Sequence, residues 1–247
     1  FILHYRYKLV IQYDGSKFFG WQVQKEKRTI QGVLEDSLKK LLKSKTRIPI
    51  HGAGRTDRGV HAWGQVAHSD IDISFKSDKL VDAFNANLPT DCRILSITKI
   101  SNHFHSRFDA SYRDYRYQLY TGNSLLFRNQ CWIKTRLNLE KLNTLSRIFI
   151  GQYDFLSFSK FSTEKKNTLC TIYESKWYLE NGMTIYKIRG NRFLHHMVRY
   201  LVGSMIAVIE EQFTTSNLLD LLKRPSKRVK IFKAPPQGLI LESVIYE

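Results

Sequence analysis

Hydrophobic and polar residues alternate in the first stretch of the chain, over residues 3–13. The apolar side of this alternation holds Tyr5, Tyr7, Leu9, Ile11 and Tyr13, and the other side holds Arg6, Lys8 and Gln12. A period of two predicts a half-buried β-strand. The Asp-Gly-Ser turn at residues 14–16 predicts its end.

A helical period is present in two longer stretches. Thr29 is a suitable N-cap, and it precedes Val33, Leu34, Leu38, Leu41 and Leu42 at helical spacing. Residues 193–211 predict a long amphipathic helix whose buried side holds Phe193, Leu194, Met197, Val198, Leu201, Val202, Met205, Ile206 and Ile209. Shorter helices are predicted over residues 79–87, 139–150 and 217–223.

The remaining elements are predicted strands, over residues 48–51, 63–68, 94–100, 115–120, 171–179, 184–189 and 239–246. Strands and helices mix without a strict βαβ alternation. This order predicts an α+β fold with largely antiparallel sheet and helices on one side. We expect two closely packed subdomains, residues 1–105 and 106–247, because no Ser/Gly-rich linker separates the halves.

The net charge of the chain indicates what kind of partner it binds. The 247 residues are 43% hydrophobic and carry a net charge of +17. That excess is larger than the magnitude of roughly 2–8 that keeps a small domain soluble, so it predicts a polyanionic partner, most simply nucleic acid. Cys92, Cys131 and Cys170 are far apart in sequence, which predicts free thiols in a reducing compartment.

No membrane segment or targeting signal is expected. Residues 1–10 carry Arg6 and Lys8 and do not form the apolar core of a signal peptide. The longest apolar stretch, residues 193–209, contains His195, His196 and Arg199, which a membrane span tolerates poorly. The sequence therefore predicts a cytoplasmic protein without a membrane partner.

A glycine-rich loop at residues 52–62 contains the candidate chemistry. A dinucleotide fingerprint fails because Asp57 stands at the position of its third glycine, and a P-loop fails because Val60 replaces its lysine. What remains is a carboxylate between Arg55 and Arg58, which would lower its pKa and keep it ionised. Such a group acts as a nucleophile or a general base. The simpler alternative is a turn aspartate that bonds its own backbone.

The stretch Arg55-Thr56-Asp57-x-Gly59-Val60-His61-Ala62 resembles the signature of the tRNA pseudouridine synthase A family. Other segments resemble that family in the same order, namely residues 13–16, 20–22, 64–68, 85–89, 104–108, 115–117, 154–155, 157–158, 193–199 and 238–239. The resemblance therefore extends over nearly the whole chain.

The resemblance implies a pseudouridine synthase fold with an active-site cleft between its subdomains. It implies an isomerase that converts uridine to pseudouridine at positions 38–40 of the tRNA anticodon stem-loop, without a cofactor and as a homodimer. Asp57 corresponds to the catalytic aspartate, and Tyr115 to the tyrosine that stacks on the base. Arg55 and Arg199 correspond to arginines near the aspartate or the target nucleotide, and Leu239 to an apolar residue against the uracil.

Two residues depart from the family pattern. Arg58 stands where a small residue is common, and Asp114 stands where a basic residue is frequent. Together with the basic run at residues 223–230, Arg58 adds to the cationic surface. We expect phosphate contacts from Arg58, Arg224, Arg228 and Lys230.

Two other interpretations concern a metal site and the function. His195 and His196 are predicted to lie on a helix, where adjacent side chains point about 100° apart, so no metal site is expected. The second interpretation is a catalytically silent RNA-binding protein on the same fold. Asp57 distinguishes the two functions, because RNA binding alone does not need a carboxylate that faces a polyanion.

Overall fold

The computed structural model describes the whole chain except residues 1–4, 73–76, 136, 161–166 and 228. The chain forms two compact units, Phe1–Ser111 with Leu241–Glu247, and Tyr112–Ile240. The sequence analysis divided the chain after residue 105 and assigned the whole C-terminal part to the second subdomain. In the structure the division follows Ser111, and the last seven residues belong to the first unit.

The first unit contains an antiparallel sheet in the order β4-β1-β3, with the short strand β2 on the far side of β3. Its strands are β1 (Tyr5–Tyr13), β2 (His51–Gly52), β3 (His61–Ile71) and β4 (Cys92–Ile100). The alternation in β1 is confirmed, because its alternate residues Tyr7, Leu9, Ile11 and Tyr13 are at most 3% exposed.

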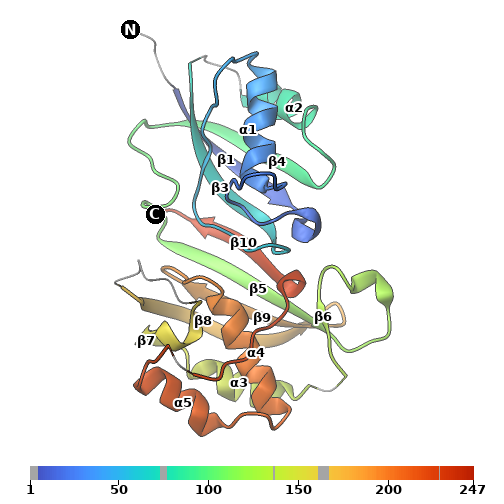
Figure 1. The fold of residues 1–247 in the computed structure, drawn as a ribbon, viewed down its shortest axis with the longest axis vertical. Helices are drawn as coiled ribbons and strands as arrows, with labels where there is room; N and C mark the ends of the chain where they lie inside the picture. Colours follow the sequence, from blue (N-terminus) through green and yellow to red (C-terminus); the bar gives the residue numbers. More distant parts are fainter. Residues whose placement is uncertain (1–4, 73–76, 136, 161–166, 228) are drawn as a thin grey trace. The chain divides into compact units, whose positions relative to one another are not determined.

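The helices of this unit are α1 (Ile30–Leu41) and α2 (Ser77–Asn85). Thr29 caps α1 as predicted, and its side chain accepts a hydrogen bond from the Gly32 N–H at 3.3 Å. Figure 1 shows the two helices next to each other, and α2 packs against β4.

The second unit contains a sheet in the order β5-β9-β8-β7, antiparallel throughout, with β6 parallel to β5 at its end. Its strands are β5 (Tyr112–Tyr120), β6 (Trp132–Ile133), β7 (Gly151–Asp154), β8 (Leu169–Glu180) and β9 (Met183–Gly190). The sequence analysis did not predict β6 or β7, because strands this short show no alternation. The α+β class with mostly antiparallel sheet is confirmed.

The helices of the second unit are α3 (Leu139–Arg147), α4 (Met197–Ile209) and α5 (Thr215–Lys223). The predicted start of the long helix at residue 193 was wrong. His196 has a left-handed backbone with φ of 64°, so α4 begins at Met197. A left-handed residue cannot continue a right-handed helix, which explains the shorter element.

The amphipathic character predicted for this helix was also wrong. From Met197 to Val208, α4 is buried everywhere except at Tyr200. The reason is the segment that precedes the last strand: a Cβ on Gly203 would lie 2.4 Å from the Phe232 carbonyl oxygen. Gly203 therefore lets this segment cover the side of α4 that the sequence pattern assigned to solvent.

The chain ends in β10 (Leu239–Ile245), which follows the 3-10 helix η4 (Pro236–Gly238). Its final residues belong to the first unit, where the Ser111 N–H donates to the Ile245 carbonyl at 2.9 Å. The Tyr246 hydroxyl donates to the Ser106 carbonyl at 2.6 Å. These bonds attach the end of the chain to the unit in which the chain began.

Candidate active site

The glycine-rich loop connects β2 to β3, as the sequence pattern predicted. The two strands pair antiparallel, with His51 opposite His68 and Gly52 opposite Ala67. Just beyond the paired residues, the Ala53 N–H donates to the Val66 carbonyl at 2.7 Å, and the Gln65 side-chain amide donates to the Gly54 carbonyl at 3.0 Å. The pairing therefore fixes the base of the loop that carries Asp57.

Hydrogen bonds hold the middle of this loop. Thr56 is buried, and its Oγ1 lies 2.8 Å from the Tyr13 hydroxyl. The Thr56 carbonyl accepts a bond from the Trp21 N–H at 3.1 Å, and the Asp57 carbonyl accepts one from the Val60 N–H at 3.2 Å. The backbone of Asp57 therefore takes part in holding the loop's shape.

Two glycines make this loop conformation possible. Gly59 has φ of 78°, and Gly20 has φ of 89° in the segment that lies against the loop. A Cβ on Gly20 would lie 2.7 Å from the Thr56 carbonyl oxygen. Only glycine adopts such positive φ values without strain, so both positions help to place Asp57.

The side chains around Asp57 differ in their surroundings. Asp57 is half-buried, whereas Arg55 and Arg58 are exposed. The Arg58 guanidinium carbon lies 4.3 Å from the centroid of the Phe19 ring, a cation–π contact, and Lys27 Nζ lies 5.0 Å from the same ring. Phe19 therefore positions Arg58, a contact that sequence reasoning missed. The predicted effect of Arg55 and Arg58 on the pKa of Asp57 stays a prediction.

Tyr115 belongs to the second unit, where it lies on β5 opposite Ile188 of β9. Its half-buried ring meets Phe193 edge to face, with centroids 5.2 Å apart and planes at 84°. This geometry is favourable for an aromatic pair. Phe193 was predicted to be a core residue of a helix, but it lies before α4 and supports the Tyr115 ring.

Arg199 lies in the first turn of α4 and is only 7% exposed. Its Nε donates to the Ala234 carbonyl at 2.8 Å, and the Ala234 N–H donates back to the Arg199 carbonyl at 2.9 Å. The sequence pattern did not place Arg199 on the buried side of this helix. It is instead a buried cation held by the segment that precedes β10.

Leu239 follows this segment and is buried at the start of β10. Tyr117 holds the residues that directly precede Leu239. The Tyr117 hydroxyl donates to the Pro235 carbonyl at 2.8 Å, and the Tyr117 ring lies against Gly238. Burial raises the pKa of Tyr117 well above its ordinary value, although nearby Arg199 acts in the opposite direction. Tyr117 therefore keeps its proton and remains a hydrogen-bond donor.

Asp114, one of the two departures from the family pattern, is a buried partner of Arg189. Its two carboxylate oxygens accept bonds from Arg189 Nε at 2.7 Å and Nη2 at 2.8 Å, between paired positions of β5 and β9. The hydrogen bond with Asp114 raises the pKa of Arg189 above its ordinary value, so Arg189 keeps its positive charge at neutral pH. The negative charge of Asp114 is thus neutralised within the sheet.

Replacing Asp114 with Ala is expected to lower the free energy of unfolding by about 2 kcal/mol, as measured by urea denaturation. Arg189 is partly exposed and can regain water, so the loss is smaller than the roughly 3–5 kcal/mol for breaking a fully buried pair. Asp70→Ala provides the control: Asp70 pairs with Arg6 through two bonds of 2.7 Å, but its side chain is 44% exposed. Equal losses in the two variants would contradict a special role for Asp114.

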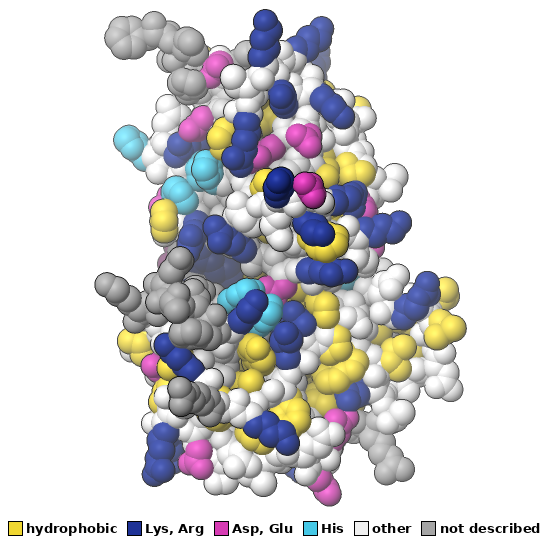
Figure 2. Space-filling model, in the orientation of Figure 1, with side chains coloured by type: hydrophobic (Ala, Val, Ile, Leu, Met, Phe, Trp, Pro, Cys, Tyr) yellow, Lys and Arg dark blue, Asp and Glu magenta, His cyan; other side chains and the backbone are white. Residues whose placement is uncertain are grey.

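The predicted phosphate contacts are spread over the surface. Arg224 caps the end of α5, and Lys230 Nζ lies 5.3 Å from the Phe232 ring centroid; both side chains are exposed. Arg228 lies outside the described residues. Lys and Arg side chains are distributed widely over the face shown in Figure 2, where acidic side chains are fewer.

His195 and His196 precede α4, so the helical argument against a shared ligand does not apply to them. Their ring centroids are 4.1 Å apart, and their planes are inclined at 53°. The backbone of His195 has a structural role, because its carbonyl accepts a bond from the Lys160 N–H at 2.9 Å. The expectation that the protein uses no metal stays a prediction.

Two other expectations concern thiols and membranes. Cys92, Cys131 and Cys170 are buried thiols, and burial raises the pKa of Cys92 to about 12. A thiol with this pKa stays protonated and is a poor nucleophile. Among the described residues, every helix is too short or too polar to cross a lipid bilayer.

The fold and the loop define a class: an α+β protein that presents an aspartate on a glycine-rich loop between two antiparallel strands. The family model described as tRNA pseudouridine synthase matches residues 9–109 and 145–247. The chain belongs to this family.

Curated relatives extend the match to nearly the full chain. A tRNA pseudouridine synthase A from Pseudothermotoga lettingae is 35% identical over 97% of this chain and 98% of its own. The protein of that name from Maridesulfovibrio salexigens is 39% identical over 98% of this chain and 90% of its own. A chain from the solved structure of a Cbf5-Nop10-Gar1 complex is 12% identical and superposes with a TM-score of 0.36. The match covers 79% of this chain and 52% of the other chain, and a likeness this low carries no argument about the fold.

Proposed function

We propose that this protein isomerises uridine to pseudouridine in the anticodon stem-loop of tRNA, at positions 38–40, without a cofactor. The observation that carries this proposal is the Arg55-Thr56-Asp57 loop, whose backbone is fixed by Tyr13, Trp21 and Val60 while the Asp57 side chain stays half-buried. Membership of the tRNA pseudouridine synthase family supports the reaction and the substrate.

The reaction rearranges one nucleotide. The N1–C1′ bond breaks, the uracil rotates while it remains bound, and C5 bonds to C1′; C5 then loses its proton to solvent, and N1 gains one. Because the product is an isomer, no oxidant and no group donor are needed. Asp57 serves this reaction by adding to C1′ or C6, or by removing the proton at C2′, and we leave these routes open.

The other site residues bind the nucleotide. Before reaction the target uridine leaves the base stack, and an aromatic ring is a suitable surface for the extruded base. We assign this role to Tyr115, whose ring Phe193 holds in place. Arg55 and Arg199 bind near the aspartate or the target nucleotide, and Leu239 provides an apolar contact to the uracil.

Binding of the whole tRNA rests on charge. We assign phosphate contacts to Arg58, Arg224, Arg228 and Lys230, which suits a chain with a net charge of +17. Recognition then depends on RNA shape and backbone more than on base sequence. We further propose that the protein acts as a homodimer in the cytoplasm, where the first unit carries the catalytic loop and residues of the second unit bind the base.

The decisive experiment uses the purified protein with tRNA that carries 5-tritiated uridine at positions 38–40. Formation of pseudouridine releases tritium, because C5 loses its hydrogen when it bonds to C1′. We expect release without any added cofactor. Tight tRNA binding without release would instead support the alternative function, a catalytically silent RNA-binding protein.

The phosphate contacts predict how binding depends on salt. Replacing Arg224, Arg228 and Lys230 with Ala should reduce the slope of log K against log salt by roughly 2–3, since each lost phosphate contact removes nearly one released counterion. Filter binding at several salt concentrations measures this slope. The control replaces Lys39, Lys40 and Lys45, which are exposed in the first unit. An unchanged slope in the first variant, or the same decrease in both, would contradict the assignment.

A further inference from the structure

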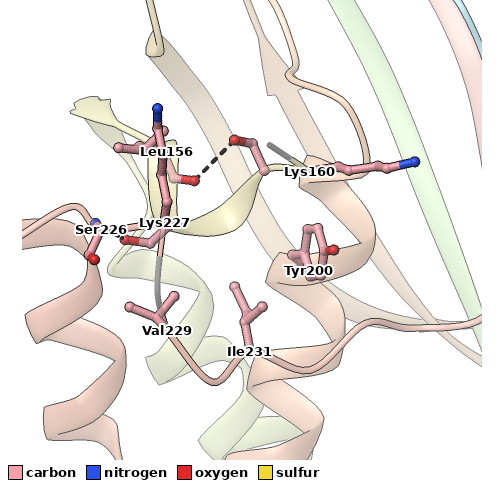
Figure 3. A pocket seen from close by; sticks show the side chains of 9 residues that line it. Leu156, Lys160, Tyr200, Ser226, Lys227, Val229 and Ile231 are labelled. Carbon is pink, nitrogen blue, oxygen red and sulfur yellow. Dashed lines mark hydrogen bonds between the residues drawn. The ribbon is translucent and has the colours of Figure 1, made fainter. Parts of the chain in front are cut away.

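A small pocket lies within the second unit, apart from the residues assigned to the target uridine. Its volume is about 230 Å³. Figure 3 shows how residues from the 3-10 helix η3 (Leu156–Phe158), from α4 and from the segment after α5 enclose it. The lining residues are Leu156, Ser157, Ser159, Lys160, Tyr200, Ser226, Lys227, Val229 and Ile231.

The walls of this pocket combine apolar and polar groups. Val229 and Ile231 contribute apolar side chains, and the Tyr200 ring adds an aromatic surface (Figure 3). The Ser159 Oγ donates to the Leu156 carbonyl at 3.0 Å and keeps its capacity to accept a bond. Within the described part of the chain, the Tyr200 hydroxyl makes no hydrogen bond, so it is available to a ligand.

One lining serine, Ser157, uses its hydroxyl for hydrogen bonds within the protein. Ser157 is buried; its Oγ donates to the Leu221 carbonyl at 2.9 Å and accepts a bond from the Ser226 N–H at 3.0 Å. These two bonds connect η3 to the end of α5 and to the segment after it. The pocket is therefore held open by buried contacts within one unit.

Among the residues that the structure describes, the charged side chains lining this pocket are all cationic. The ammonium groups of Lys160 and Lys227 point away from Val229 and Ile231 (Figure 3), and none of the nine lining residues is an Asp or Glu. Lys233 Nζ lies 5.9 Å from the Tyr200 ring centroid and adds a third cation. An anionic group at the rim is favoured by these charges.

We propose that this pocket binds one ribose-phosphate unit of the tRNA backbone, at a nucleotide other than the target uridine. This inference rests on the proposed function, which supplies the RNA. The lysines bind the phosphate, the apolar side chains cover the ribose carbons, and the Tyr200 hydroxyl bonds the 2′-OH, the group that distinguishes RNA from DNA. The volume is below the roughly 300–1,000 Å³ of typical small-molecule sites, which suits a single backbone unit.

The pocket also adjoins the segment that carries Arg199. Tyr200 follows Arg199 in α4, and the Lys160 N–H bonds the His195 carbonyl just before this helix. A backbone unit bound by Lys160 and Tyr200 therefore lies next to the start of the helix that carries Arg199. Occupation of the pocket fixes the tRNA relative to a residue that we assign to the target nucleotide.

The test compares two variants that damage the pocket differently. Lys160→Ala with Lys227→Ala removes the charges, whereas Val229→Trp fills the space without changing the charge. Each is expected to raise KM for tritium release about tenfold by loss of backbone contacts, with kcat within about twofold. Phosphate-ethylation interference should lose its signal at the same one or two phosphates in both variants.

The control is Lys39→Ala with Lys40→Ala, an equal change of charge on α1 of the first unit. A folded Val229→Trp protein with unchanged KM would overturn the proposal. If the Val229→Trp protein is not folded, as judged by the absence of a cooperative unfolding transition, the two lysine double variants decide. An equal rise in KM for the pocket pair and for the control pair would then overturn the proposal. Failure of the proposed function is distinguishable, because the unmodified protein itself would then release no tritium.

Discussion

Asp57→Ala is expected to abolish tritium release from 5-tritiated tRNA, with kcat reduced by about 10⁴-fold or more, the size of loss expected for a group that performs the chemistry. The change keeps the bonds that the Asp57 carbonyl and the Thr56 side chain make within the loop and to Tyr13, so the protein should remain folded. Affinity for tRNA should be retained or slightly increased, because a negative charge that faces a polyanion is removed.

The experiment measures single-turnover tritium release and tRNA binding for the same protein samples. Asp36→Ala is the matched control, because it removes an exposed carboxylate from α1 of the same unit. We expect this control to retain full activity. Undiminished release by purified Asp57→Ala protein would disprove the assignment of Asp57 and with it the proposed mechanism.

Arg199→Ala has the second largest expected effect. Loss of a preorganised cation near the target nucleotide is expected to lower the single-turnover rate by about 10²–10³-fold. The change also leaves the Ala234 carbonyl without the Nε–H donor that lies 2.8 Å away. An unpaired buried acceptor should reduce the free energy of unfolding by about 1–3 kcal/mol.

Two further variants separate activity from stability. Arg199→Lys retains a cation but not the planar guanidinium, so it should recover only part of the rate. Arg147→Ala removes an exposed arginine from α3 of the same unit and should change neither quantity. A folded Arg199→Ala protein that reacts at the full rate would exclude Arg199 from the site.

Much of the local structure could be predicted because it depends on neighbouring residues. The alternation in β1 and the cap at Thr29 follow from side-chain periods and from one hydroxyl that reaches a nearby N–H. The loop around Asp57 was predicted between two strands for the same reason, since glycines and flanking alternation lie together in sequence. The observed bounds of β2 and β3 differ by a few residues from the predicted ones, because strand ends depend on the partner strand.

The errors concerned α4, where distant segments decide the outcome. The apolar spacing in residues 193–211 does fit a helix, but the left-handed backbone at His196 delays its start to Met197. The segment near Phe232 then buries the face on which Arg199 lies, since Gly203 permits its close approach. No period within the helix contains information about a segment some thirty residues away.

By itself the sequence determined the excess of positive charge, the α+β class and the glycine-rich loop, and it predicted a reactive carboxylate at Asp57 in that loop. Only the tertiary structure decided that Arg58 lies on Phe19, that Asp114 neutralises Arg189, and that three separate segments enclose a cationic pocket beside Tyr200. The physical reason is the distance along the chain over which each kind of interaction acts. Periods and turn residues act over a few positions along the chain, whereas ion pairs, ring contacts and cavities form between residues that folding alone brings together.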